Sequence, residues 1–149
     1  MNQKKGSLLV VDDDKKNREL ISNYLCKSGY STTEADGGEC ALKLVEKQSF
    51  DLVLLDIMMS DMDGYDVLKK LRQHYRPTEL PIIMVTAKRH SNDIVNALEI
   101  GANDFISKPI DLKVLKARAE TQIKLKQTEQ AYQNIRRDLE QLVAKRTSE

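Results

Sequence analysis

Acidic side chains follow two apolar runs that lie far apart along the chain. Asp12 and Asp13 come directly after the run 8–11, and Asp56 comes directly after the run 52–55. A continuously apolar run is typical of a parallel strand covered on both faces, so a carboxylate at its end lies where the sheet opens to solvent. Carboxylates brought together repel one another unless a cation lies among them, and hard oxygen ligands suit Mg²⁺. The sequence therefore predicts a divalent cation site.

Two further apolar runs end in polar residues of other types. Thr86 follows the run 82–85, and Lys108 follows the run 105–107. A lysine directed into an acidic site is a fixed countercharge for a phosphoryl oxygen, so this set indicates phosphoryl chemistry. Each residue alone has a simpler explanation, because threonine at a strand end commonly caps or turns and a lysine is commonly a solvated amine. Pro109 makes a cis peptide bond after Lys108 accessible.

The acids also have structural explanations. Aspartate is a favoured residue at helix N-termini, and Asp14 is predicted to cap the helix that follows it. This leaves Asp12 and Asp13 without a structural role, whereas Asp56 alone could be an ordinary turn residue. The presence of polar groups at several strand ends favours a functional site.

Apolar runs alternate with amphipathic stretches, which predicts five βα units and a doubly wound α/β fold with a parallel sheet. The expected strands are 7–11, 31–35, 51–55, 81–86 and 103–107, and the expected helices are 15–28, 38–48, 64–74, 91–100 and one from about 111. The polar strand 31–35 suits an edge and the apolar strand 51–55 a centre, which favours the flavodoxin-like order 2-1-3-4-5. In this order ligands bind between the first and third strands, beyond their carboxyl ends.

Composition narrows the remaining possibilities. The chain has 149 residues, enough for one domain with an appendage, and its formal net charge of +1 gives no bulk reason to expect nucleic acid or an anionic membrane as a partner. It lacks the roughly 20-residue apolar stretch of a membrane span and a secretory signal, which predicts a cytoplasmic protein.

The helix expected at 15–28 should bury one face, formed by Leu20, Ile21 and Leu25. Cys26 and Cys40 are expected to be buried free thiols, because their spacing matches neither a zinc site nor a disulfide framework.

Five segments resemble the receiver domain of two-component response regulators over residues 7 to about 121. They are LLVVDDD at 8–14, DLVLLDIMM at 51–59, MDGY at 62–65, PIIMVTA at 81–87 and GANDFISKP at 101–109. Each is modestly specific alone, but their order and spacing together are highly specific. The resemblance implies a module that accepts a phosphoryl group from a phosphohistidine on a sensor histidine kinase or a phosphotransfer protein. It also implies that the module is no enzyme beyond modification and hydrolysis at its own acceptor.

The resemblance implies roles for individual residues. The phosphoacceptor would be Asp56. Ligands of Mg²⁺ or Mn²⁺ would come from two strand ends: Asp12, Asp13, Asp56 and the backbone carbonyl of Met58. Groups around the phosphoryl oxygens would be Thr86, the backbone of Ala87, and Lys108 with a cis peptide bond to Pro109.

A conformational switch is also implied by the resemblance. Thr86 would move toward the phosphoryl oxygens and vacate space into which Phe105 turns, which would remodel helix 91–100, strand 103–107 and the following helix. Two positions depart from the family pattern. Ser60 stands where the family usually has Pro, and Phe105 stands where Tyr is also common.

The last helix is expected to continue far beyond the sheet. About 35 residues of helix would project some 50 Å at 1.5 Å per residue. Leu115, Ala119 and Ile123 follow one another at steps of four, consistent with packing on the sheet. We therefore divide the chain into a receiver domain at 1–121 and a signalling helix at 122–149.

Apolar side chains of this helix then alternate at steps of three and four, as in the a/d seam of a coiled coil. The seam consists of Leu125, Thr128, Tyr132, Ile135, Leu139 and Leu142. This pattern favours a parallel homodimer, with a helix that folds back or frays as the alternative, because three heptads are marginal. The end resembles the helix that joins receivers to output modules such as a histidine kinase or a cyclase. We expect the chain to be one part of a longer protein, with no output domain of its own.

Two other functions compete with this interpretation. Asp12 to Asp14 also matches the D-x-D motif of aspartate-nucleophile phosphohydrolases, in which Asp12 would be the nucleophile and Asp14 the acid. That class needs a further acidic pair after a later strand and commonly a cap insertion, and neither is visible. The other competitor is a dimerisation or scaffold module with a vestigial acidic pocket. The full set of acids together with Thr86 and Lys108 argues against decay.

Overall fold

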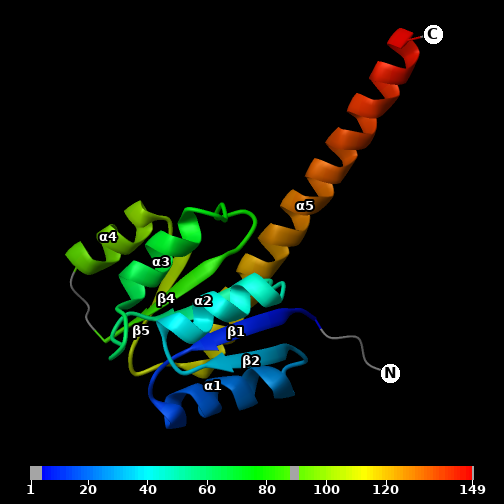
Figure 1. The fold of residues 1–149 in the computed structure, drawn as a ribbon. Helices are drawn as coiled ribbons and strands as arrows, with labels where there is room; N and C mark the ends of the chain where they lie inside the picture. The colour runs from blue at the N-terminus through cyan, green and yellow to red at the C-terminus, as the bar shows by residue number, and fades with distance from the viewer. Residues whose placement is uncertain (1–4, 88–90, 149) are drawn as a thin grey trace.

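The computed structural model describes residues 5–87 and 91–148. Its strands are β1 (Ser7–Val11), β2 (Ser31–Ala35), β3 (Leu52–Asp56), β4 (Ile82–Thr86) and β5 (Asp104–Ser107). Its helices are α1 (Lys15–Lys27), α2 (Gly38–Lys47), α3 (Gly64–Arg72), α4 (Ser91–Ile100) and α5 (Leu112–Ser148). Figure 1 shows the helices packed around the central sheet and α5 projecting far beyond it.

The five strands form one parallel sheet in the order β2-β1-β3-β4-β5. This confirms the predicted doubly wound α/β class and the predicted strand order. The ends of the elements agree with the sequence prediction to within two residues, as expected where terminal turns fray. The chain therefore reverses its winding between β1 and β3, the place at which this fold class binds ligands.

Both faces of the sheet are covered by helices. Val53 and Leu55 of β3 point into the cluster beneath α2, α3 and α4, whereas Leu52 and Leu54 point into the cluster beneath α1 and α5. Successive side chains of a strand face opposite sides, so a strand buried on both sides must be apolar throughout. This is the physical reason why residues 52–55 are apolar without a break.

Two expectations about α1 and the cysteines were wrong. Leu20 is 57% exposed, whereas Ile21 and Leu25 are buried. Cys26 is exposed and Cys40 only partly buried. The buried stripe of α1 is narrower than the apolar pattern suggested, and the Cys26 thiol lies at its margin, with Sγ 2.9 Å from a threonine hydroxyl of β2.

The start of β5 is fixed by a single arginine. The Arg72 guanidinium donates to the carbonyl oxygens of Gly101 at 2.8 Å and Leu80 at 2.9 Å, and to Oδ1 of Asn103 at 2.9 Å. Burial lowers the pKa of Arg72 to about 10. Gly101 has a φ of +125°, a conformation that L side chains rarely adopt, and it ends α4 there. Arg72 thus joins α3, β4 and the turn into β5.

Helix α5 first packs on the sheet and then leaves it. Leu115, Ala119 and Ile123 are buried, as predicted from their spacing. Lys126 makes the next contact, where its Nζ donates to the carbonyl oxygen of Phe50 at 3.0 Å and to Oδ1 of Asp51 at 3.2 Å. This contact lies before β3, at the opposite end of the strand from Asp56, and Figure 1 shows the remaining turns extending into solvent.

Within residues 5–87 and 91–148, none of the helices combines the length and the apolar character that crossing a membrane requires.

Candidate functional site

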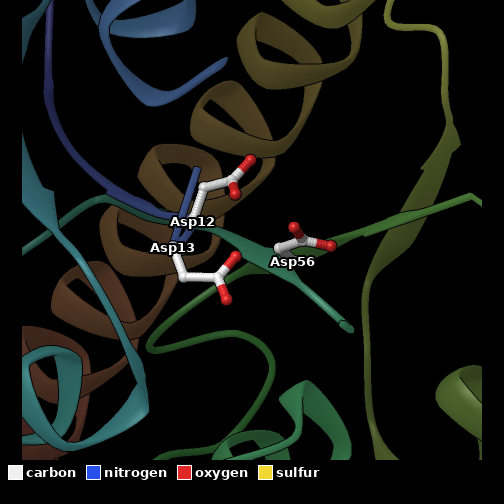
Figure 2. A group of neighbouring side chains, drawn as sticks. All are labelled: Asp12, Asp13 and Asp56. Atoms are coloured by element: carbon white, nitrogen blue, oxygen red, sulfur yellow. The ribbon is translucent and has the colours of Figure 1, made fainter. Parts of the chain in front are cut away.

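The register of the sheet brings the predicted acids together. β1 and β3 pair in parallel with Val11 opposite Leu55, so the residues that follow, Asp12 and Asp56, emerge side by side. Figure 2 shows these two carboxylates and that of Asp13 grouped at this edge. One oxygen from each of the three lies within 4.8 Å of the others. Asp12 and Asp56 are buried, whereas Asp13 is exposed and opens the group to solvent.

Lys108 reaches this acidic group from the end of β5. β4 and β5 pair with Thr86 opposite Ser107, and the Lys108 amide donates to the Thr86 carbonyl oxygen at 2.8 Å. The Lys108 ammonium lies 2.9 Å from Oδ2 of Asp56 and 3.9 Å from Oδ2 of Asp12. The peptide bond between Lys108 and Pro109 is cis. The lysine is therefore an internal countercharge to the three acids, and it compensates only part of their charge.

Asp12 and Lys108 affect each other's ionisation. Burial raises the pKa of Asp12 to about 6, and the neighbouring Asp56 charge acts in the same direction, although the Asp14 amide and Lys108 oppose it. Burial works against the charged form of Lys108, but the hydrogen bond to Asp56 and the negative charges of Asp56, Asp12 and Asp13 together outweigh it and raise the pKa of the ammonium. The lysine therefore stays charged, while Asp12 holds its charge at an energetic cost.

The donor set fits a hard divalent cation. It consists of three carboxylates that share one small space, two of them buried, and such oxygen donors suit Mg²⁺ with water at its open positions. A cation there would offset the repulsion from Asp56, which adds to the effect of burial on the pKa of Asp12. The peptide of Met58 adjoins the group, since its amide donates to Oδ1 of Asp56 at 3.3 Å, while its side chain is exposed.

The predicted switch residues occupy successive strands. Thr86 is buried at the end of β4, beside the end of β3, where Asp56 pairs with Val85. Phe105 lies opposite Met84 on β5, partly buried against the cluster beneath α2, α3 and α4. Ala87 follows β4 and is exposed.

Asp14 acts as the helix cap that the sequence predicted. Its Oδ1 accepts the Lys16 amide at 3.0 Å and lies 3.5 Å from the Asn17 amide at the start of α1. Its own amide donates to Oδ1 of Asp12 at 2.9 Å, which holds that carboxylate in place. The Asp14 carboxylate is therefore engaged with the helix.

The loop between β3 and α3 makes contacts to Asp13 and to the start of α2 that sequence reasoning missed. The Ser60 amide donates to Oδ2 of Asp13 at 3.0 Å. The Asp61 carboxylate accepts the amides of Gly38 and Glu39, each at 3.2 Å. No local pattern in the sequence signals these bonds, because each joins residues more than twenty positions apart.

Gly64 is required by a close approach of two backbones. Its amide donates to the Ile57 carbonyl oxygen at 2.8 Å, so α3 begins directly against the end of β3. A Cβ atom at this position would overlap the Asp56 carbonyl oxygen and lie 2.7 Å from the Ile57 Cα atom. Since both obstacles are backbone, no side-chain movement relieves them.

We therefore expect Gly64→Ala to destabilise the fold by about 1–3 kcal/mol or more, as overpacking against fixed atoms does. Urea unfolding of the pure chain measures this. Gly6→Ala is the matched control, because its nearest contact would be the Asp51 side chain at 3.3 Å, and we expect a cost below about 1 kcal/mol. Equal costs for the two variants would contradict the close approach at Gly64.

Comparison with known proteins identifies the family of this chain. A family model for the response regulator receiver domain matches residues 8–120. A probable transcriptional regulator, ycf27 of Cyanidium caldarium, is 38% identical over 138 residues, which cover 90% of this chain and 54% of that protein.

Solved structures agree with this match. A two-component response regulator from Clostridium difficile superposes with a TM-score of 0.75 at 31% identity, covering 80% of this chain and 97% of that one. A probable two-component system response regulator/GGDEF domain protein gives a TM-score of 0.79 at 28% identity, covering 83% of this chain and 51% of that one. The chain spans about half the length of the curated relatives that it matches.

Proposed function

Because this chain belongs to the response regulator receiver family, we propose that Asp56 accepts a phosphoryl group from a phosphohistidine on a sensor histidine kinase or a phosphotransfer protein. One observation carries the proposal. Three carboxylates share a space within 4.8 Å of one another, and a lysine contacts the Asp56 oxygen at 2.9 Å. This set provides a nucleophile, cation ligands and a phosphoryl countercharge together.

The chemistry follows from the positions of these residues. An Asp56 carboxylate oxygen forms a bond to phosphorus while the bond from phosphorus to the histidine nitrogen breaks, and that nitrogen keeps the electron pair. Lys108 and the Thr86 hydroxyl would neutralise charge that spreads over the phosphoryl oxygens. When bound, Mg²⁺ held by Asp12, Asp13, Asp56 and the Met58 carbonyl would supply further neutralisation of those oxygens. The Ala87 backbone is the remaining proposed contact.

The choice of Asp56 over Asp12 has structural support. The Lys108 ammonium lies closer to Asp56, at 2.9 Å, than to Asp12, at 3.9 Å. Asp14, the acid that a phosphohydrolase would need, is engaged as the cap of α1. We therefore propose a signalling module without turnover beyond its own acyl phosphate. The hydrolase remains the alternative that the experiments below distinguish.

We also propose that the phosphorylated state reaches α5 through β5. Thr86 and Phe105 lie on adjacent strands, so a shift of the threonine changes the space beside the ring. Next to Phe105, both carboxylate oxygens of Asp104 accept hydrogen bonds from Nη1 of Arg118 in α5, at 2.8 and 2.9 Å. A rearrangement at β5 therefore acts on the helix that leaves the globule.

A parallel homodimer through the C-terminal helix completes the proposal. The large apolar side chains of the predicted seam are all more than half exposed: Leu125, Tyr132, Ile135, Leu139 and Leu142. In a parallel pair, Lys124 before the seam would face Glu129 of a second copy, an attractive contact. We propose the division into a receiver at 1–121 and a signalling helix at 122–149, of which 1–4, 88–90 and 149 lie outside the described residues. An output module would follow this helix.

Localising the modified residue tests the proposed function. We expect acetyl phosphate with Mg²⁺ to add one phosphoryl group, and reduction with borohydride followed by peptide mass spectrometry to place it at Asp56. An adduct on Asp12 would replace this proposal with the hydrolase, and a chain that takes no adduct would favour a scaffold.

A further inference from the structure

The loop between β3 and α3 connects the acidic group to the start of α2. Ser60 donates its amide to Oδ2 of Asp13 at 3.0 Å, across 47 positions of sequence. The next residue, Asp61, accepts the amides of Gly38 and Glu39 through separate oxygens, at 3.2 Å each. Two adjacent residues thus contact two different parts of the molecule.

The first turn of α2 depends on this loop for its cap. Its N-cap residue is Gly37, which has no side chain, so Asp61 supplies the acceptor that the first free amides need. A Cβ on Gly37 would lie 2.7 Å from both Asp61 oxygens, so glycine is what allows the carboxylate to approach. Hydrogen bonds from Glu39 and Gly38 lower the pKa of Asp61, although slight burial opposes them. The cap therefore remains negatively charged at neutral pH, as a helix N-terminus favours.

We propose that Ser60 and Asp61 are positioning residues that couple the orientation of the Asp13 carboxylate to the first turn of α2. The inference rests on the proposed function in one respect, the cation at the acidic group. Asp13 is the exposed member of that group, so it is the carboxylate freest to turn when a cation arrives. When the Asp13 carboxylate turns, its Oδ2 atom either keeps the hydrogen bond and displaces the Ser60 amide, or the hydrogen bond breaks. Either change reaches Asp61 through the backbone dihedrals of Ser60 and the planar peptide that joins the two residues, and from there the amides of Gly38 and Glu39.

Proline at position 60 isolates this hydrogen bond. Proline has no amide hydrogen to donate to Asp13. Ser60→Ala is the matched control, because it removes the hydroxyl and keeps the amide. Proline is also the residue that related receivers usually carry here, so we expect Ser60→Pro to fold.

Amide NMR of the ¹⁵N-labelled full chain, titrated with MgCl₂, measures the coupling. In the unmodified chain and in Ser60→Ala, we expect the Gly38 and Glu39 signals to shift along the same saturation curve as those of Asp13 and Asp56. In Ser60→Pro, Gly38 and Glu39 should lose most of this shift while Asp56 keeps it. If the Gly38 and Glu39 signals still shift with Mg²⁺ in Ser60→Ala, the coupling depends on the Ser60 amide and not on the serine side chain.

The outcomes separate the inference from the proposed function. Signals of Asp13 and Asp56 that respond to Mg²⁺ while Gly38 and Glu39 stay fixed overturn the coupling alone. An equal response of Gly38 and Glu39 in Ser60→Pro and in the unmodified chain overturns it too. If Mg²⁺ shifts none of the amides around the acids, the proposed cation site fails and the inference fails with it.

Discussion

Asp56→Asn is expected to abolish phosphorylation by acetyl phosphate, with no adduct above background in the intact mass. The carboxamide has nearly the shape of the carboxylate but offers no anionic oxygen to attack phosphorus, so the loss is chemical. The variant should remain folded, because removing one of two acids beside Asp12 relieves repulsion in the buried group. Circular dichroism and urea unfolding check that it does.

Two companion variants make this result decisive. Asp12→Asn should still give an adduct at Asp56, formed more slowly because a cation ligand is lost. Asp66→Asn, an exposed acid on α3, should be phosphorylated like the unmodified chain. An adduct that persists in Asp56→Asn and disappears in Asp12→Asn would instead assign the nucleophile to Asp12 and identify a phosphohydrolase.

The double variant Ile135→Glu with Leu139→Glu is expected to be a monomer in sedimentation equilibrium, whereas we expect the unmodified chain to be a dimer. Both side chains are more than half exposed on α5 and one turn apart, at the centre of the predicted seam. Burying such a side chain contributes about 1.5–3 kcal/mol, and each substitution occurs twice per dimer. The introduced charges would also face each other across the axis. A shift of the dissociation constant by several orders of magnitude follows.

The matched control carries the same charges on another side of the helix. Gln127→Glu with Gln141→Glu lies outside the seam and should leave the dimer intact. Substitution is preferable to removal of 122–149, because Ile123 is buried and Lys126 is bonded to Asp51. A chain that is monomeric without any substitution, or a dimer that survives both glutamates in the seam, would remove the coiled coil from the proposal.

The sequence was sufficient for the fold and for the identity of the acidic group. The runs before Asp12 and Asp56 are apolar throughout because helices cover both faces of their strands, as is typical of a parallel sheet in an α/β fold. Once the strand order is known, the ends of β1 and β3 must be neighbours, so the acids must meet. The steps of four from Leu115 to Ile123 predicted that the first turns of α5 pack on the sheet, because residues at this spacing share one face of a helix.

The tertiary structure alone determined the contacts that no periodic pattern of the sequence predicts. Whether Leu20 and Cys26 at the margins of α1 are covered depends on the width of the contact, which a helical pattern does not specify. The Ser60 and Asp61 bonds join loops whose approach depends on the packing of every element between them. Local sequence determines which face of an element is apolar, but only the folded chain determines which backbone amide a loop carboxylate reaches.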